Sequence, residues 1–425
     1  MTRLSRRNWL RAGLAAGLGP GLGAGGWSWS VHGGEEEKLP VAVVATVYTK
    51  NSHADVLAGK ILEGWQQAGG VGPGLRLASL WVDQTPDGEL SRELATRHGV
   101  RWCRSIDEAL TLGTDRLQVA GVLSIGEHGN YPYTPDTQQH QYPRRQFLEA
   151  IAATFRRAGQ VVPVFNDKHL GYRFADAEAM VELSRELKFP LLAGSSLPVA
   201  WRVPGLDLPH NSEIEGMVSV GYGGLEAYGF HALEMHQCLL ERRQGEETGV
   251  QAVRTIPSSQ IFSAAEQGVW SRSLLEAALA TLPQGSTPAV REWKLRDDSV
   301  VYHLEHVDGL RTAVVMANGL AGQFCCAIKL KGREEPVATW FKLQENPPFG
   351  HFAYLLRAIE QSIRQRKTVY PVERTLLTTG ILDRVMQSHA RKGERIETPE
   401  LAIRYRGTDW PYANHPDSPL HLPND

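Results

Sequence analysis

Asp167, Lys168 and His169 form a run of ionisable residues directly after a short apolar stretch, Val161–Phe165. That stretch is typical of a buried parallel strand, and a helical pattern follows from Ala175. In open α/β sheets, ligands bind at the carboxyl ends of the strands. A lysine there can donate or accept a proton if burial lowers its pKa. We therefore expect Lys168 near the centre of any active site, with Asp167 and His169 contacting the substrate.

Glu127 and His128 occupy the equivalent place after another predicted strand, Leu117–Ile125. Adjacent carboxyl and imidazole groups can form an acid/base pair. A polar surface loop with local hydrogen bonds is an equally weighted alternative. Metal binding by these residues with His140 is a minority interpretation because the spacing is irregular, so we predict no metal site.

Ser195 and Ser196 follow the next predicted strand, Pro190–Ala193, and supply small hydroxyl groups. Arg202 lies shortly after them and could bind a carboxylate or polarise a hydroxyl. We predict that these three residues contact the substrate.

His231 and Glu234 lie three residues apart on a predicted helix, Ala227–Arg243. This spacing places both side chains on one helix face. They could act as a substrate-binding or proton-relay pair, in which His231 is catalytic and Glu234 binds substrate. A hydrogen bond on the helix surface is the commoner explanation for such a pair.

The turn after the first predicted strand, Ala45–Lys50, lacks the glycines of a dinucleotide-binding GxGxxG motif. Those glycines allow backbone amides to approach the pyrophosphate. If NAD(P) is bound, the candidate contacts are Thr46, Lys50, Asp83 and Glu127, with Asp83 ending the second strand where a ribose-binding acid would lie. Lys50 is otherwise a solvated surface residue, and Asp83 could equally cap its turn. NAD(P) is thus possible but doubtful.

Strands alternate with helices over residues 39–205, which predicts a Rossmann-like, doubly wound parallel sheet. Residues 206–407 contain successive strand-like runs without helices between them, which predicts an α+β domain with an open, mainly antiparallel sheet. Two C-terminal helices could pack back on the first domain, and residues 408–425 form a tail. The predicted strands are Val41–Val47, Leu75–Val82, Trp102–Cys103, Glu213–Tyr222, Val300–His306, Thr312–Ala317, Phe324–Leu330 and Ala338–Phe341, besides those named above.

The composition is that of an ordinary globular protein, with 42% hydrophobic and 22% charged residues. A formal net charge of −2 gives no electrostatic argument for binding nucleic acid or an anionic membrane. The four cysteines form no CxxC pair, which excludes zinc-knuckle and thioredoxin-type motifs.

The first 38 residues are typical of an export signal and linker. Paired arginines, Arg6 and Arg7, precede a weakly apolar run over 12–25, a pattern that indicates the twin-arginine route. The run is too short and glycine-rich to span a bilayer. We expect an exported, periplasmic protein without a membrane span; a disordered basic start is the alternative.

These features together resemble the glucose-fructose oxidoreductase/inositol dehydrogenase (Gfo/Idh/MocA) family over about residues 40–407, in an exported bacterial subgroup. Asn166–Leu170 stands where that family has Glu-Lys-Pro, with Asp167 for the glutamate and His169 for the proline. His231 matches the family's helix histidine, while Ala227 replaces its aspartate. The resemblance implies proton transfer by Lys168, NAD(P) as the cofactor, and oligomers formed through the C-terminal sheet.

The expected function is an oxidoreductase acting on a sugar, polyol or glycoside, with Lys168 as the acid/base. Glu127, His128 and His231 would orient hydroxyls or transfer protons. Two alternatives stay open. One is a cofactor-independent lyase, epimerase or hydrolase acting on an oxidised sugar, and the other is a non-catalytic carbohydrate-binding protein on a degenerate dehydrogenase fold.

Overall fold

A parallel sheet forms the first half of the chain in the computed structural model, which describes residues 37–283, 293–344 and 346–414. Its strand order is β3-β2-β1-β4-β5-β6, and each neighbouring pair is parallel. The order reverses between β1 and β4, where a doubly wound sheet binds its ligands. The strands are β1 (Leu39–Ala45), β2 (Leu75–Val82), β3 (Arg101–Trp102), β4 (Gly121–Ile125), β5 (Val164–Asp167) and β6 (Leu191–Gly194).

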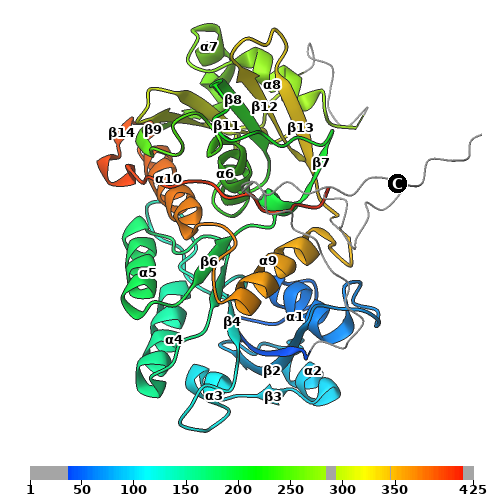
Figure 1. Ribbon diagram of the computed structural model, residues 1–425. Helices are drawn as coiled ribbons and strands as arrows, with labels where there is room; N and C mark the ends of the chain where they lie inside the picture. The colour runs from blue at the N-terminus through cyan, green and yellow to red at the C-terminus, as the bar shows by residue number, and fades with distance from the viewer. Residues whose placement is uncertain (1–36, 284–292, 345, 415–425) are drawn as a thin grey trace, which may run out of the picture. The chain divides into compact units, whose positions relative to one another are not determined.

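Helices cover both faces of this sheet because its strands are apolar on both sides. In β1, Ala42 and Val44 face one core cluster, while Val41 and Val43 face the other. The first face packs against α3 (Ile106–Thr111), α4 (Arg144–Ala158) and α5 (Phe174–Leu187). The second packs against α1 (His53–Glu63), α2 (Ser91–His98) and α9 (His351–Gln365). Figure 1 shows α4 and α5 on one side, with α1 and α9 on the other.

The second sheet is mixed, with the strand order β14-β9-β10-β11-β8-β12-β13-β7. All its pairs are antiparallel except β11 with β8. Its strands are β7 (Trp201–Val203), β8 (Ile214–Gly221), β9 (Val250–Pro257), β10 (Val300–His306), β11 (Arg311–Met316), β12 (Phe324–Leu330), β13 (Val337–Lys342) and β14 (Ile396–Glu397). A parallel sheet followed by this mainly antiparallel one confirms the predicted fold class.

Helices cover both faces of the second sheet. On one face lie α6 (Ala227–Leu240) and α10 (Val372–Ala390). On the other lie α7 (Ile261–Glu266) and α8 (Arg272–Leu279), whose residues Ile261 and Leu275 pack against Val218, Val315 and other strand residues (Figure 1). The apolar spacing in α8, with Leu274, Leu275 and Ala278 buried, produces this cover.

Several strands begin or end away from their predicted limits. β5 begins at Val164 because Pro163 precedes it and cannot donate a ladder hydrogen bond, and it continues through Asn166 and Asp167. β7 lies before residue 206 but joins the second sheet by pairing with β13. The predicted export signal lies outside the described residues. Within those residues, no helix combines the length and hydropathy needed to cross a membrane.

Candidate active site

A cavity of about 590 Å³ lies at the carboxyl edge of the parallel sheet, within the size range of small-molecule sites. Glu127 and His128 reach it from the loop after β4, and Lys168 follows β5 directly. Helix α6 contributes His231, and the start of α1 contributes His53. The remaining lining residues are Asn51, Val56, Ser196, Leu197, Tyr222, Ala227, Tyr228, Phe324, Leu343, Phe349, His351 and Phe352.

Lys168, Glu127 and Arg144 form a buried ionic cluster beside the cavity. Lys168 Nζ lies 2.9 Å from Glu127 Oε1, and Arg144 Nη2 donates to Glu127 Oε2 at 2.7 Å. Arg144 is fully buried, and Lys168 and Glu127 are nearly so. Burial acts to raise the pKa of Glu127, but the positive charges of Lys168 and Arg144 outweigh it and hold that pKa well below the usual value. Glu127 is therefore ionised at neutral pH.

The backbone at Lys168 and His128 adopts the left-handed conformation, with φ of 61° and 67°. Such angles are uncommon for residues other than glycine and are often found at functional sites. The Lys168 amide donates to the carbonyl of Gly194 at 3.1 Å, which holds this turn against the end of β6. The two turns bring both side chains to the same cavity.

Gly126 is needed beside the ionic cluster for a steric reason. A Cβ at this position would lie 2.5 Å from Arg144 Cγ. The missing side chain lets Arg144 reach Glu127 from the start of α4. Gly126 thus makes room for an internal arginine.

His53 and Asp167 form a hydrogen-bonded pair, with 2.6 Å between His53 Nδ1 and Asp167 Oδ2. The ring of His53 packs edge-on against His128 and Phe352, at centroid distances of 5.5 and 4.9 Å. Asp167 thus lies behind His53 instead of lining the cavity itself. His128 is exposed and does not pair with Glu127 as the adjacent positions suggested.

His231 bonds to Ser195, with 2.6 Å between its Nδ1 and the serine Oγ. Burial and the charge of Lys168 hold the pKa of His231 well below its usual value. Glu234 has other partners and accepts hydrogen bonds from the hydroxyls of Thr378 (2.7 Å) and Thr375 (3.1 Å). Burial raises its pKa. The Ser195 amide also donates to Glu234 at 3.3 Å, so this serine contacts both residues of the predicted pair.

Several predicted site residues do not line this cavity. Arg202 donates to the carbonyls of Leu206 and Pro198, at 2.7 and 3.0 Å, and lines a separate small cavity. His169 is buried behind the site and accepts from Arg144 Nη1 at 2.8 Å. Ser195 and Glu234 support the site from behind, whereas Ser196 lines the cavity.

The first turn of the parallel sheet does not fit the usual pyrophosphate contacts. The Thr46 hydroxyl donates to the carbonyl of Glu127 at 2.6 Å, so Thr46 holds the neighbouring loop. The buried Asp55 carboxylate accepts from the Asn51 amide at 2.8 Å and pairs with Lys50 at 3.1 Å. A carboxylate therefore already occupies the N-terminal end of α1, where a dinucleotide phosphate would need positive potential.

Asp83, the candidate ribose-binding acid, forms a hydrogen bond with another side chain of the protein. The Tyr131 hydroxyl donates to Asp83 Oδ2 at 2.6 Å. Beside it, Gln84 and Asn130 exchange two hydrogen bonds of 3.0 and 2.8 Å. The loop after β4 thus binds to the end of β2, on the side of the sheet where the adenosine of a dinucleotide would be held.

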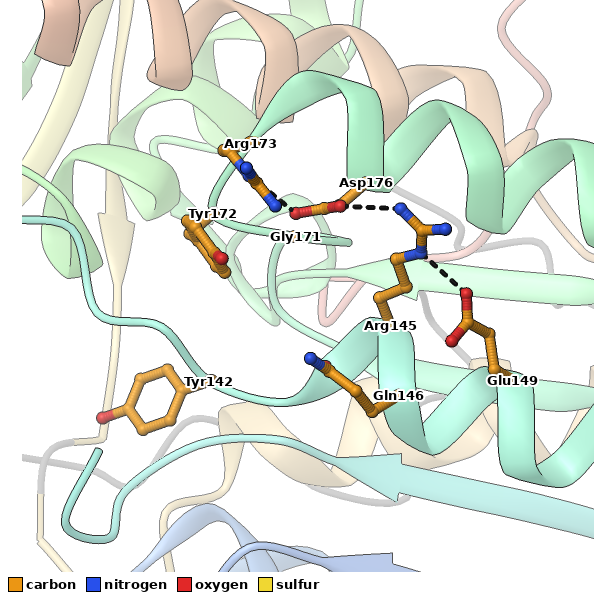
Figure 2. A pocket seen from close by; sticks show the side chains of 8 residues that line it. All are labelled: Tyr142, Arg145, Gln146, Glu149, Gly171, Tyr172, Arg173 and Asp176. Carbon is orange, nitrogen blue, oxygen red and sulfur yellow. Dashed lines mark hydrogen bonds and ion pairs between the residues drawn. The ribbon is translucent and has the colours of Figure 1, made fainter. Parts of the chain in front are cut away.

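A second hollow lies between the N-terminal ends of α4 and α5 (Figure 2). Its two arginines share one carboxylate, because Arg145 Nη1 and Arg173 Nε lie 2.9 and 3.1 Å from the two oxygens of Asp176. Arg145 also donates to Glu149 at 2.7 Å. The four charges cancel, so this hollow has no net attraction for an anion.

No group of three or more His, Cys, Asp or Glu residues is placed to hold a metal ion within residues 37–283, 293–344 and 346–414. His140, part of the minority metal interpretation, stacks on Tyr133 with a centroid distance of 4.1 Å. Its Nε2 lies 3.0 Å from the carbonyl of Tyr131.

Sequence reasoning missed three residues that build the site: His53, Arg144 and His351. His351 lines the cavity from the start of α9, and burial together with the nearby His53 lowers its pKa to about 3. One signal for His53 was available, because it opens the helix after β1, at the edge of the sheet where ligands bind. Nothing local marks Arg144 or His351.

No protein-family model and no curated protein matches this chain. Solved structures with the same fold include GenD2 from gentamicin A biosynthesis in complex with NAD (TM-score 0.55, 15% identity, 86% of this chain and 97% of that one). Others are scyllo-inositol dehydrogenase from Lactobacillus casei (0.52, 10%, 85% and 98%) and myo-inositol dehydrogenase from Corynebacterium glutamicum (0.51, 14%, 85% and 98%). The chain therefore has the fold of Gfo/Idh/MocA-type dehydrogenases.

Proposed function

We propose that this protein is an enzyme that transfers protons on a sugar-type small molecule, with Lys168 as the acid/base. One observation carries the proposal: the Lys168 ammonium lies at a ligand-sized cavity, 2.9 Å from an ionised carboxylate, at the carboxyl edge of the parallel sheet. A charged lysine in this setting can donate a proton to a substrate oxygen and then recover it. Glu127 would keep the Lys168 ammonium in place.

The lining of the cavity supports a carbohydrate-type substrate. Aromatic rings of Tyr222, Tyr228 and Phe324 provide apolar surfaces for the C–H face of a sugar. Ser196 and His231 provide hydrogen-bonding groups for its hydroxyls. Inositol dehydrogenases among the structures with this fold are named for polyol substrates of the same kind.

The reaction is proposed to proceed without a nicotinamide bound in the usual manner. The turn after β1 lacks the GxGxxG glycines, Asp55 occupies the N-terminal end of α1, and Asp83 bonds to Tyr131. Lyase, epimerase or hydrolase chemistry on an already oxidised sugar needs only proton transfers by side chains. The cavity contains side chains that can transfer protons, among them Lys168, His53 and His231.

An NAD(P)-dependent dehydrogenase is the second candidate, favoured by the likeness in fold to GenD2 in complex with NAD. Calorimetric titration of the purified protein with NAD+ and NADP+, together with mass spectrometry of the native protein, separates the two candidates. We expect no bound nicotinamide and no heat of binding. Stoichiometric cofactor would reverse the order of the two candidates.

Conversion of a panel of sugars, polyols and keto-sugars, followed by NMR, tests the role of Lys168. We expect Lys168→Met to reduce turnover about 100-fold or more, the usual size of a general acid/base effect. Lys188→Met is a matched control, because Lys188 has nearly the same φ (60°) but lies exposed after α5. Binding of a sugar without any conversion would instead support a carbohydrate-binding protein.

Export to the periplasm by the twin-arginine route is a further part of the proposal, supported by Arg6, Arg7 and the weakly apolar run that follows. A reporter fused to residues 1–38 should be exported. Replacement of both arginines by lysine should retain it in the cytoplasm. Export of the doubly substituted fusion would contradict this route.

A further inference from the structure

His53 is the first residue of α1 and lines the candidate cavity beside Phe352. Its Nδ1 lies 2.6 Å from Asp167 Oδ2. The His53 side chain is 15% exposed and that of Asp167 only 1%. The carboxylate is therefore shielded from water, whereas the imidazole can be reached from the cavity.

This contact determines which nitrogen of His53 carries the proton. An ionised carboxylate can only accept hydrogen bonds, so Nδ1 must donate. In the neutral ring, Nε2 is then the unprotonated nitrogen and can accept a proton from a ligand. The Asp–His pairs of hydrolytic enzymes orient their histidine in the same way.

His231 has the opposite arrangement in the same cavity. The Leu197 amide donates to Ser195 Oγ at 3.0 Å, and His231 Nδ1 lies 2.6 Å from the same oxygen. We assign the serine hydroxyl as the donor to His231 Nδ1, which gives the hydroxyl proton an acceptor. With Nδ1 accepting, the proton of the neutral ring lies on Nε2. In the same cavity, His53 Nε2 can therefore accept a proton, and His231 Nε2–H can donate a hydrogen bond.

We propose that His53, oriented by Asp167, is a general base and that His231, oriented by Ser195, is a hydrogen-bond donor to an enolate oxygen, which assigns the substrate to sugars that carry a ketone or aldehyde. This inference rests on the proposed function and names its substrate class. Such a division of roles between a base and a neutral histidine suits proton removal next to a carbonyl.

The step balances without an oxidant. His53 Nε2 takes the proton from the carbon next to the carbonyl, and the C–H electron pair forms a carbon–carbon double bond. The carbonyl π pair moves to oxygen, where His231 Nε2–H and the Lys168 ammonium stabilise the negative charge. The imidazolium of His53 is stabilised by Asp167 and later returns its proton to carbon.

Histidine-selective ¹⁵N labelling and long-range ¹H–¹⁵N spectra at pH 7.5 test the two tautomers without any substrate. His53→Gln and His231→Gln identify the two signals. We expect His53 to carry its proton on Nδ1 and His231 on Nε2, and Asp167→Asn to lower the Nδ1–H population of His53. The reverse tautomer at either ring would overturn the inference, as would a charged His53.

Deuterium incorporation from D₂O into D-fructose, L-sorbose and D-xylulose, followed by NMR, tests the chemistry. We expect His53→Gln to lower the exchange rate about 100-fold or more and Asp167→Asn to lower it less. His210→Gln is the control, because His210 forms a similar pair with Asp409 (3.2 Å) at the surface and should leave exchange unchanged. The unfolding curve of each variant identifies any loss that is due to misfolding.

The outcomes separate this inference from the proposed function. If Lys168→Met abolishes exchange and a folded His53→Gln does not, the assignment of His53 fails while the proposed function stands. If Lys168→Met leaves exchange unchanged while His53→Gln abolishes it, the role of Lys168 fails and the base assignment stands. Absence of exchange for every sugar would overturn the enolisation step; conversion of other sugars in the broader panel would then still support the proposed function.

Discussion

Lys168 Nζ and Glu127 Oε1 lie 2.9 Å apart at the end of two neighbouring parallel strands, both largely shielded from water. β4 and β5 are adjacent in the sheet, so the residues that follow them meet at the same edge. Arg144 adds a second positive charge to the same carboxylate. The candidate site therefore contains a fixed ionic cluster. His53, His128, His231 and His351 line the same cavity.

Glu127→Gln should destabilise the protein strongly. The variant leaves Lys168 and Arg144 close together without a compensating negative charge, and breaking a buried pair in this way costs about 3–5 kcal/mol. Urea unfolding at pH 7.5 measures the change. As a control, Glu186→Gln removes an exposed pair with Arg156 and should cost less than about 1 kcal/mol. Equal effects of the two variants would contradict the buried ionic cluster.

Gly126→Ala should destabilise the protein by about 1–3 kcal/mol, the usual cost of overpacking. The new Cβ would meet Arg144 Cγ at 2.5 Å, and the fully buried arginine has little room to move. Gly224→Ala is the matched control, because its Cβ would meet nothing within 4 Å. Comparison of the two urea midpoints tests whether the glycine is needed for the passage of Arg144.

His128→Gly should be more stable than His128→Ala by roughly 0.5–1 kcal/mol. Both variants lose the imidazole, but only glycine adopts a φ of 67° without steric cost. At Glu149, inside α4, the order should reverse, with alanine the more stable by about 1 kcal/mol. Thermal unfolding of the four variants measures both differences. If alanine were the better residue at both positions, the left-handed turn at His128 would be wrong.

The free energy of unfolding should fall as the pH decreases from 7 to 5. Burial lowers the pKa of His169 to about 4 and those of His236 and His351 to about 3, whereas an unfolded histidine titrates near 6.5. The unfolded chain therefore binds more protons in this range, so acid favours unfolding. Each ring should contribute about 1–2 kcal/mol over these two pH units.

Urea unfolding of His236→Gln across the same pH range checks the contribution of one ring. The variant should show a shallower pH dependence than the native chain. His210→Gln, which changes a half-buried histidine paired with Asp409 at the surface, is the comparison and should alter the slope less than His236→Gln does. The stability that the ionised Glu127 provides is lost only at lower pH, as pH falls below its unfolded pKa and through its depressed folded pKa.

Much of the fold could be predicted because its signals are local. Val300–His306 and Phe324–Leu330 are strands with the predicted bounds, since an apolar β-branched or aromatic run needs no distant information to indicate a strand. The helices α7 and α8 were not predicted, although α8 has an apolar face. The order in which the strands pair cannot be predicted from local sequence either, as the parallel pairing of β8 with β11 shows.

The sequence by itself determined that ionisable residues stand at the ends of apolar strands, which was enough to select Lys168, Glu127, His128 and Ser196 for the cavity. Only the tertiary structure decided their partners. His53 and Asp167 are 114 positions apart, and Ser195 and His231 are 36 apart. Hydrogen-bond partners depend on distances of a few ångströms between separate elements, and those distances arise from packing across the whole chain. The same reason explains why the partner of Asp83 could not be predicted. Its position at the end of the second strand is that of a ribose-binding acid, but in the structure it accepts a hydrogen bond from Tyr131.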